Sequence, residues 1–226
     1  MIDPAPPEAV ARLARSVGPP ADDVIREMDE RAAREDFPTV GPEVGGLLAW
    51  LVGLTGARRV FEFGSGFGYS AYWMARHLPA DGEVVLVDRD ADLLADARDY
   101  LARGGLADRA TVRTGDAVEV VREYDDLDLV LVDNEKERYV EAFEAARPRL
   151  SDEAVVVADN ATTAGSIEFD RLRSLVDGDG TVPPADAEDA TAGVATYLDH
   201  VRAAEGFETV LVPLGEGLAL SRRTDP

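Results

Sequence analysis

From residue 58 onward, short apolar runs alternate with helix-forming segments, and this alternation restricts the fold more than any other feature. The runs are rich in Val and Leu and end in polar residues, as expected for parallel strands buried on both faces: RRVFEFG (58–64), EVVLVDR (83–89), ATVRTG (110–115), LDLVLVD (127–133) and AVVVAD (154–159). Helical patterns lie between them, at 69–78, 91–104, 117–124 and 138–150. Repeated βα units of this kind predict an α/β fold with a doubly wound, mostly parallel sheet and right-handed crossovers.

The segments on either side of this core are different in character. Three helices are expected before the first strand, near 7–16, 21–35 and 42–55, and Asp22 or Asp23 can cap the second of them. Two further strands at 207–214 and 217–223 surround a G-E-G turn and predict an antiparallel hairpin at the sheet edge. The stretch 177–193, rich in Gly, Pro and Asp, is expected to be a loop.

The acidic composition of the chain, with a single lysine, is typical of a protein adapted to concentrated salt. The chain of 226 residues has a formal net charge of −22, and Lys136 is its only lysine, so that the other 22 basic residues are arginine. Such an acidic surface repels itself unless concentrated salt screens it, which favours a halophilic protein over an ordinary acidic one. With no cysteine, no signal peptide and no membrane-spanning apolar run, we expect a cytoplasmic protein without disulfides.

A glycine-rich turn follows the first strand. Its pattern is E-x-G-x-G-x-G, with Tyr69 where a dinucleotide-binding fingerprint needs its third glycine. This spacing is the pattern of S-adenosylmethionine-dependent methyltransferases, although a turn that binds no ligand is the alternative. Asp88, at the end of the second strand, is placed to accept hydrogen bonds from ribose hydroxyls. Asp116, after the third strand, can contact adenine, cap the next helix, or do both.

Oxygen-bearing side chains also follow the fourth and fifth strands. Asp133 ends one, and Asp159 with Asn160 ends the other, so the fold brings all three to the same edge of the sheet. Two carboxylates and an amide oxygen, without His or Cys, suit Mg²⁺ or another hard divalent cation. The alternative is that Asp133 caps a helix and Asp159-Asn160 forms a turn. The histidines, His77 and His200, lie in helical patterns away from these strand ends.

Three motifs together carry a family resemblance. D-x-x-K-x-R-Y at 133–139, D-N at 159–160 and E-x-G-x-G-x-G-Y-S at 62–70 resemble the cation-dependent O-methyltransferases of the catechol and caffeoyl-coenzyme A type. The likeness runs from residue 37 through the closing hairpin. It implies a seven-stranded Rossmann-like methyltransferase fold in one domain (1–226), with an N-terminal helical cap (1–56) and a Rossmann-like core (57–226).

The same resemblance implies roles for individual residues. Asp133, Asp159 and Asn160 would bind the cation, and Lys136 would be the base that accepts the substrate hydroxyl proton. Lysine can give up its proton near a metal, whereas arginine cannot. The residues implied around S-adenosylmethionine are Val40, Glu62, Gly64, Ser65, Gly66, Ser70, Asp88, Asp116, Ala117 and Asp133.

The acceptor is less well defined than the donor. Family members often carry a bulky, partly aromatic loop after the D-N pair, whereas ATTAGSIEF (161–169) is small and polar at first. From the resemblance we expect a small hydroxylated, catechol-like acceptor. We also expect a homodimer, because the N-terminal helices and the hairpin have apolar faces. The alternatives are a tRNA hydroxyuridine O-methyltransferase of the same fold and a ligand-binding protein without catalysis. Arginines interspersed with acids argue against nucleic acid.

Overall fold

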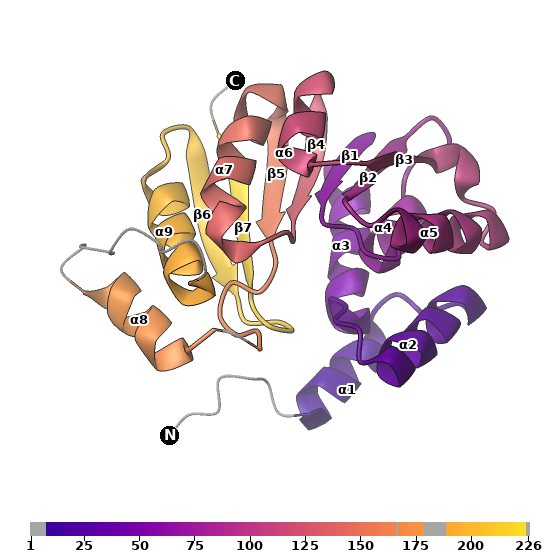
Figure 1. The fold of residues 1–226 in the computed structure, drawn as a ribbon, viewed down its shortest axis with the longest axis horizontal. Helices are drawn as coiled ribbons and strands as arrows, with labels where there is room; N and C mark the ends of the chain where they lie inside the picture. The colour runs from indigo at the N-terminus through magenta and orange to yellow at the C-terminus, as the bar shows by residue number, and fades with distance from the viewer. Residues whose placement is uncertain (1–7, 166, 179–188, 225–226) are drawn as a thin grey trace.

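A seven-stranded sheet forms the centre of the molecule (Figure 1). The computed structural model describes residues 8–165, 167–178 and 189–224. The strand order is β3-β2-β1-β4-β5-β7-β6, in which β7 pairs antiparallel with both β5 and β6 and the other neighbours are parallel. The strands are β1 (Arg59–Phe63), β2 (Glu83–Asp88), β3 (Ala110–Thr114), β4 (Leu127–Val132), β5 (Leu150–Ala158), β6 (Phe207–Val212) and β7 (Leu218–Arg223). The predicted mostly parallel sheet with a C-terminal hairpin is confirmed.

Helices cover both faces of the sheet. On one side lie α3 (Gly41–Thr55), α4 (Tyr69–Ala75) and α5 (Ala91–Arg103); on the other lie α6 (Ala117–Val120), α7 (Tyr139–Ala146) and α9 (Ala190–Ala203) (Figure 1). Successive strand residues point to opposite faces, so Val60 joins the first core and Phe61 joins the second. Burial on both faces explains why these strands read as continuous apolar runs.

The N-terminal helices extend the first core. The two helices α1 (Glu8–Val17) and α2 (Asp23–Glu35) precede α3, as predicted. Of the two candidate caps, Asp22 begins α2, since its carboxylate accepts a hydrogen bond of 2.9 Å from the backbone of Ile25. Ile25 and Met28 are fully buried against the core, and the chain then runs through residues 36–40 toward the carboxyl edge of the sheet.

Several boundaries differ from the prediction: the helices expected at 69–78 and 117–124 end at Ala75 and Val120, and two other differences are larger. The helix expected at 138–150 ends at Ala146, because Pro148 lies in a short 3₁₀ turn that follows, and β5 therefore begins at Leu150 rather than 154. The predicted loop 177–193 is also too long at its end. Asp189 caps α9 by accepting a hydrogen bond of 3.0 Å from Ala192, so a helix begins where a loop was expected. Residues 179–188 of that loop lie outside the described residues.

One helix was missed. The α8 helix (Phe169–Asp177) buries only Leu172 among its described side chains, and it packs with Ile167 and Val194 in a small separate core. Leu172, Leu175 and Val176 do recur at helical spacing, but the helix has only 9 residues, and its contacts with α9 stabilise it.

The sheet order fixes where a ligand can bind. The chain builds outward from β1 to β2 and β3, then returns to place β4 and β5 on the other side of β1. The crevice at the carboxyl ends of β1 and β4 is such a switch point, and ligands of open α/β sheets bind there.

Candidate functional site

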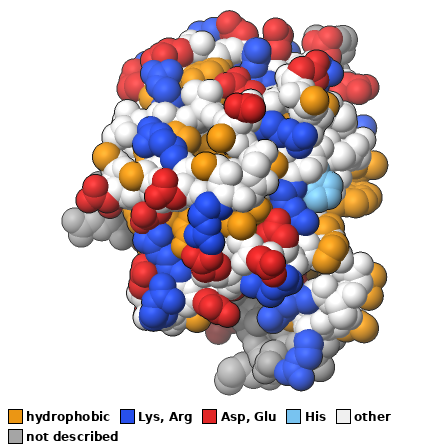
Figure 2. All heavy atoms as spheres, turned by 90° about the vertical axis from the view of Figure 1, so that its right-hand side faces the viewer, with side chains coloured by type: hydrophobic (Ala, Val, Ile, Leu, Met, Phe, Trp, Pro, Cys, Tyr) orange, Lys and Arg blue, Asp and Glu red, His pale blue; other side chains and the backbone are white. Residues whose placement is uncertain are grey.

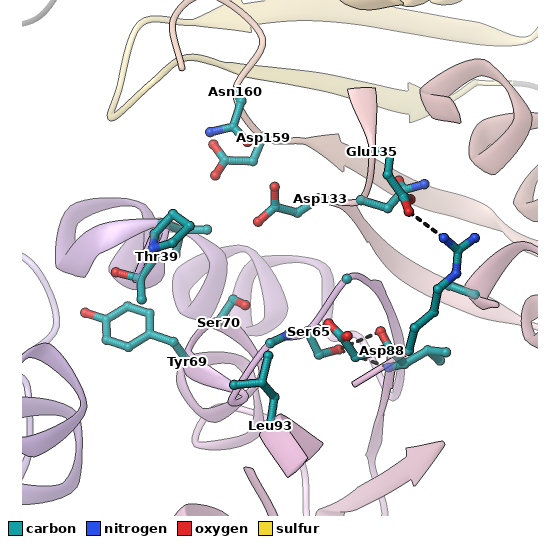
Figure 3. Close-up of a pocket in the computed structure, with 18 of the residues that line it drawn as sticks. Thr39, Ser65, Tyr69, Ser70, Asp88, Leu93, Asp133, Glu135, Asp159 and Asn160 are labelled. Carbon is teal, nitrogen blue, oxygen red and sulfur yellow. Dashed lines mark hydrogen bonds and ion pairs between the residues drawn. The ribbon is translucent and has the colours of Figure 1, made fainter. Parts of the chain in front are cut away.

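A cavity of about 600 Å³ occupies this switch point (Figure 3). It is lined by every residue that the sequence placed in the site except Glu62. At one end lie the glycine turn and Asp88; at the other lie Asp133, Asp159 and Asn160 (Figure 3). The remaining predicted residues along the wall are Val40, Ser70, Asp116, Ala117 and Lys136.

The glycine turn that follows β1 has a backbone conformation and close contacts that residues with a Cβ atom would not tolerate. Gly64, Gly66 and Gly68 all have positive φ, at 78°, 48° and 82°. A Cβ atom at Gly64 would lie 2.5 Å from the carbonyl oxygen of Asp133, so this close approach of the two strand ends requires glycine. Ser65 ties the turn to β2, because its Oγ accepts a hydrogen bond of 3.0 Å from the Val87 backbone. The turn is therefore a fixed part of the cavity wall.

Asp88 supports this turn as well as facing the cavity. Its Oδ2 accepts a hydrogen bond of 2.8 Å from the Gly66 backbone, and its Oδ1 accepts one of 2.9 Å from Asp90. A carboxylate has about four acceptor positions, so two remain for a ligand. Asp88 is therefore partly buried and hydrogen-bonded to the chain rather than fully solvated. Its contact with ribose stays a prediction.

Asp116 caps a helix and joins an ion-pair network at the cavity edge. Its Oδ1 accepts a hydrogen bond of 3.0 Å from Val118, which begins α6. Arg89 and Arg138 both pair with its carboxylate, and Arg89 also pairs with Glu135 at 2.6 Å (Figure 3). Burial acts against ionisation, but the hydrogen bonds from Arg138 and Arg89 outweigh it and lower the pKa of Asp116. The helix-cap reading is confirmed, and adenine contact stays a prediction.

Glu62 lies behind the cavity wall rather than in it. The residue is fully buried and does not line the cavity; Ser70 donates a hydrogen bond to its Oε1, while Oε2 has no partner. Burial raises the pKa of Glu62 to about 7, although the hydrogen bonds from Ser70 and Ser65 oppose this. Glu62 therefore acts on the cavity through Ser70, and a direct contact with a cofactor stays a prediction.

The other end of the cavity gathers the oxygen-bearing side chains of β4 and β5 (Figure 3). Asp159 is only 3% exposed, and its Oδ1 has no hydrogen-bond partner. Burial and the neighbouring charge of Asp133 raise the pKa of Asp159 to about 8. Burial likewise raises the pKa of Asp133, although Lys136 works against this. Lys136 supplies one positive charge beside these two carboxylates, so that together they would still carry an uncompensated negative charge if both were ionised.

The donor set fits a hard cation. Among the described residues, no group of three or more His, Cys, Asp or Glu side chains is arranged to hold a metal. The amide of Asn160, which also lines the cavity, would be the third oxygen donor beside Asp133 and Asp159. A buried carboxylate oxygen without a partner costs free energy unless something occupies it. Oxygen donors alone are what Mg²⁺ and related cations prefer.

Lys136 lies beside Asp133 on the same wall. Its Nζ is 3.1 Å from Asp133 Oδ1 and 3.3 Å from the carbonyl oxygen of Asn134, and it lies 5.0 Å from the centre of the Tyr139 ring. The side chain is 17% exposed. Lys136 is therefore not a solvated surface lysine, because its side chain packs into the cavity wall.

The sequence did not single out several residues of the wall. The α2–α3 connection contributes Phe37, Pro38 and Thr39 beside Val40, and Glu216 comes from the hairpin turn. Tyr69 lines the cavity and donates a hydrogen bond of 2.6 Å to Asp29. The G-E-G pattern around Glu216 signalled only a turn, because nothing in the sequence places that turn beside β5. The two histidines lie outside the cavity lining, as expected.

Comparisons with known proteins give a consistent result. The model of a family described as O-methyltransferase matches residues 16–224. The chain is 29% identical over 153 residues to a catechol O-methyltransferase of Niastella koreensis, covering 65% of this chain and 69% of that protein. It is 35% identical over 130 residues to a catechol O-methyltransferase of Mycobacterium tuberculosis, covering 57% and 59% of the two. The O-methyltransferase of Bacillus cereus, solved in complex with SAH, matches with a TM-score of 0.79 at 25% identity over 95% of this chain and 97% of that one.

Proposed function

The chain belongs to the O-methyltransferase family and is a methyltransferase, and from this premise we propose that it uses a divalent cation to methylate a small catechol-like acceptor. The methyl donor is S-adenosylmethionine, and the cation is Mg²⁺ or a similar ion. The observation that carries the cation assignment is the buried, unpartnered Oδ1 of Asp159 beside Asp133. This end of the cavity is separated from the glycine turn by the space that a donor would fill (Figure 3).

The glycine-turn end suits the adenosyl part of the donor. In this proposal Gly64, Ser65 and Gly66 let the backbone approach the ligand, while Asp88 accepts hydrogen bonds from its ribose. Asp116 and Ala117 lie beside the adenine. Val40 covers the donor, Ser70 is held toward it by Glu62, and Asp133 accepts from its amine. The SAH-bound relative from Bacillus cereus, which has the same fold, supports this assignment.

The other end suits a cation and a pair of acceptor oxygens. Asp133, Asp159 and Asn160 would hold the cation. When bound, a divalent cation would supply a positive charge that orients two neighbouring acceptor oxygens and lowers the pKa of a bound hydroxyl. The chain's own residues hold the acceptor in line with the donor methyl, and bringing the two together accounts for much of the rate.

Lys136 is the proton acceptor in this proposal. Its Nζ already lies at the cavity wall, 3.1 Å from Asp133, and it would take the hydroxyl proton as the oxygen attacks the methyl carbon. The proton moves from the acceptor oxygen to Nζ, the oxygen–carbon bond forms, and the carbon–sulfur bond breaks. A lysine can act as this base only in its neutral form, which arginine does not reach.

Charge at the surface favours a small acceptor over tRNA. On the face in Figure 2, Lys and Arg side chains are interspersed with Asp and Glu rather than gathered into a stripe. At the cavity edge, Arg89 and Arg138 are both paired with Asp116. Phosphate binding would have to compete with these acids.

The same proposal includes a cytoplasmic homodimer. Among the described residues, no helix combines the length and apolar character needed to cross a bilayer. Trp50 and Leu54 on α3 are 54% and 62% exposed, and Val210 and Leu211 on β6 are about equally exposed. These apolar side chains are the surface that a second copy would cover. Sedimentation in molar KCl tests this, and a monomer at all concentrations would contradict it.

Chelation is the direct test of the function. EDTA should abolish methyl transfer to catechol while SAH binding, measured by calorimetry, changes little. Asp159→Ala should have the same effect, whereas Asp152→Ala, at an exposed position of the same strand, should leave both unchanged. Full turnover in EDTA would overturn the cation assignment.

A further inference from the structure

The carboxylate of Glu216 holds the side-chain amide of Asn160. Asn160 Nδ2 donates a hydrogen bond of 2.6 Å to Glu216 Oε2, across 56 residues of sequence. We infer that Glu216 is a positioning residue that turns the amide oxygen of Asn160 toward the cation, an inference that rests on the proposed function. Glu216 acts through Asn160 and is not itself a ligand in this inference.

The chemistry of the pair determines which way the amide faces. An amide group has a donor end and an acceptor end of nearly the same shape, and rotation by half a turn exchanges them. An ionised carboxylate only accepts hydrogen bonds, so the atom beside Glu216 must be the nitrogen. The oxygen is then left at the opposite side of the group. In the reverse orientation the NH₂ group would face the cation and repel it.

The turn that carries Glu216 is attached firmly to the segment after β5. The backbone carbonyl of Glu216 accepts hydrogen bonds from Thr162 N at 3.0 Å, Thr163 N at 2.9 Å and Thr162 Oγ1 at 2.8 Å. Gly217, with φ +87°, packs so closely that a Cβ atom there would lie 2.1 Å from Thr162 Oγ1. These contacts come from backbone atoms and from neighbouring residues. A substitution of the Glu216 side chain therefore leaves the attachment in place.

Asn160 itself has a constrained backbone. Its φ is +53°, the left-handed conformation, which Asn tolerates better than most residues. This backbone conformation restricts the rotamers that the side chain can adopt, but the terminal amide can still rotate. The hydrogen bond that Asn160 donates to Glu216 removes this freedom. Partners of metal ligands that fix orientation in this way typically contribute 10- to 100-fold to metal affinity.

The test measures cation affinity rather than turnover. Mn²⁺ is titrated by calorimetry into SAH-bound protein in molar KCl, which screens long-range charge effects. Glu216→Ala should weaken binding about 10- to 100-fold. Glu216→Gln places an amide that can either accept from Asn160 Nδ2 or donate to Asn160 Oδ1, so it no longer fixes the orientation and should also weaken binding, though less than Glu216→Ala. Glu208→Ala, which removes an equal charge from an exposed position of β6, is the matched control and should have no effect.

A double-mutant cycle then separates orientation from charge. In an Asn160→Ala background there is no amide left to orient, so Glu216→Ala should cost almost nothing further. If it costs as much there as in the parent protein, Glu216 acts by its charge and the inference is wrong. Melting temperatures within a few degrees of the parent protein establish that each variant is folded.

Asp159→Ala distinguishes this inference from the proposed function. Loss of Mn²⁺ binding in Asp159→Ala together with unchanged binding in Glu216→Ala would overturn the positioning role alone. Unchanged binding in Asp159→Ala would overturn the cation site itself and the positioning role with it.

Discussion

The Nζ atom of Lys136 lies 3.1 Å from Oδ1 of Asp133, so the only lysine of the chain contacts a carboxylate assigned to the cation. The contact explains how a charged side chain remains in a partly buried position. A cation bound by Asp133 would compete with Lys136 for that carboxylate. In the proposed function, cation binding would therefore be linked to the release of Lys136 toward the acceptor.

Replacing Lys136 by arginine tests its role as the base. Lys136→Arg keeps the positive charge beside Asp133 but removes the ability to take a proton at accessible pH. Methyl transfer should fall by roughly 10²- to 10⁴-fold, with SAH affinity little changed. The loss should be smaller for acceptors acidic enough to ionise without a base. Nearly full activity on weakly acidic acceptors would show that the lysine supplies only charge.

Asp88→Ala should weaken S-adenosylmethionine binding by about 1–3 kcal/mol through loss of charge-assisted hydrogen bonds. Because Asp88 also accepts from Gly66, part of this loss could come from the glycine turn. Asp90→Ala provides the control, since Asp90 caps α5 and lies outside the cavity lining. It should cost about 1 kcal/mol of stability without changing cofactor affinity. Unchanged affinity in Asp88→Ala would remove this residue from the site.

The raised pKa of Glu62 should make the unfolding free energy of the cofactor-free protein depend on pH. Its pKa of about 7 in the folded protein is above the ordinary value of 4.5, so the folded state binds this proton more tightly than the unfolded state. The stability that it contributes is present below pH 4.5 and is lost as the pH rises to about 7. Relative to the parent protein, Glu62→Gln should therefore gain up to about 3 kcal/mol of unfolding free energy between pH 4.5 and 8. Denaturant unfolding of both proteins measures the difference; a gap that does not change with pH would contradict the assignment.

Salt should stabilise the protein. The 45 acidic residues exceed the 23 basic ones, so that even complete pairing would leave 22 carboxylates facing only like charges. Concentrated KCl weakens the exposed Arg–carboxylate pairs, each worth at most about 1 kcal/mol, but it also relieves this larger repulsion. The melting temperature should rise between low and molar KCl. A flat or falling profile would contradict the halophilic interpretation.

The parts of the fold predicted well are those with regular periodicity. The β1, β2 and β4 strands are buried on both faces, so their apolar runs identify them without knowledge of their partners. The α8 helix has a helical apolar pattern over only 9 residues, which is shorter than the window over which such a pattern is informative. The end of the predicted loop was misplaced because the capping role of Asp189 depends on a helix whose start is hidden by preceding Gly, Pro and Asp residues.

For the candidate site, the sequence located the ends of strands but not the contacts between distant segments. Asp133 and Asp159 could be placed together because parallel strands end at one edge. The hydrogen bond between Asn160 and Glu216 depends on how the hairpin packs against the end of β5. The sequence also placed Glu62 beside the ligand, because it does not show that Ser70 lies between Glu62 and the cavity. Motif spacing contains neither kind of information.

The close approach of Gly64 to the Asp133 carbonyl has a consequence for how acceptor choice can change over evolutionary time. The glycine-turn end of the cavity and the end that contains Asp133 are connected through the backbones of β1 and β4, which are adjacent strands. The backbones are so close at Gly64 that no side chain fits between them. The walls formed by residues 37–39 and 164–165, in contrast, come from connections between elements. New acceptor shapes can be accommodated there while the reacting atoms keep their spacing. Diversification is therefore expected in those connections, with positions 64 and 133 held constant.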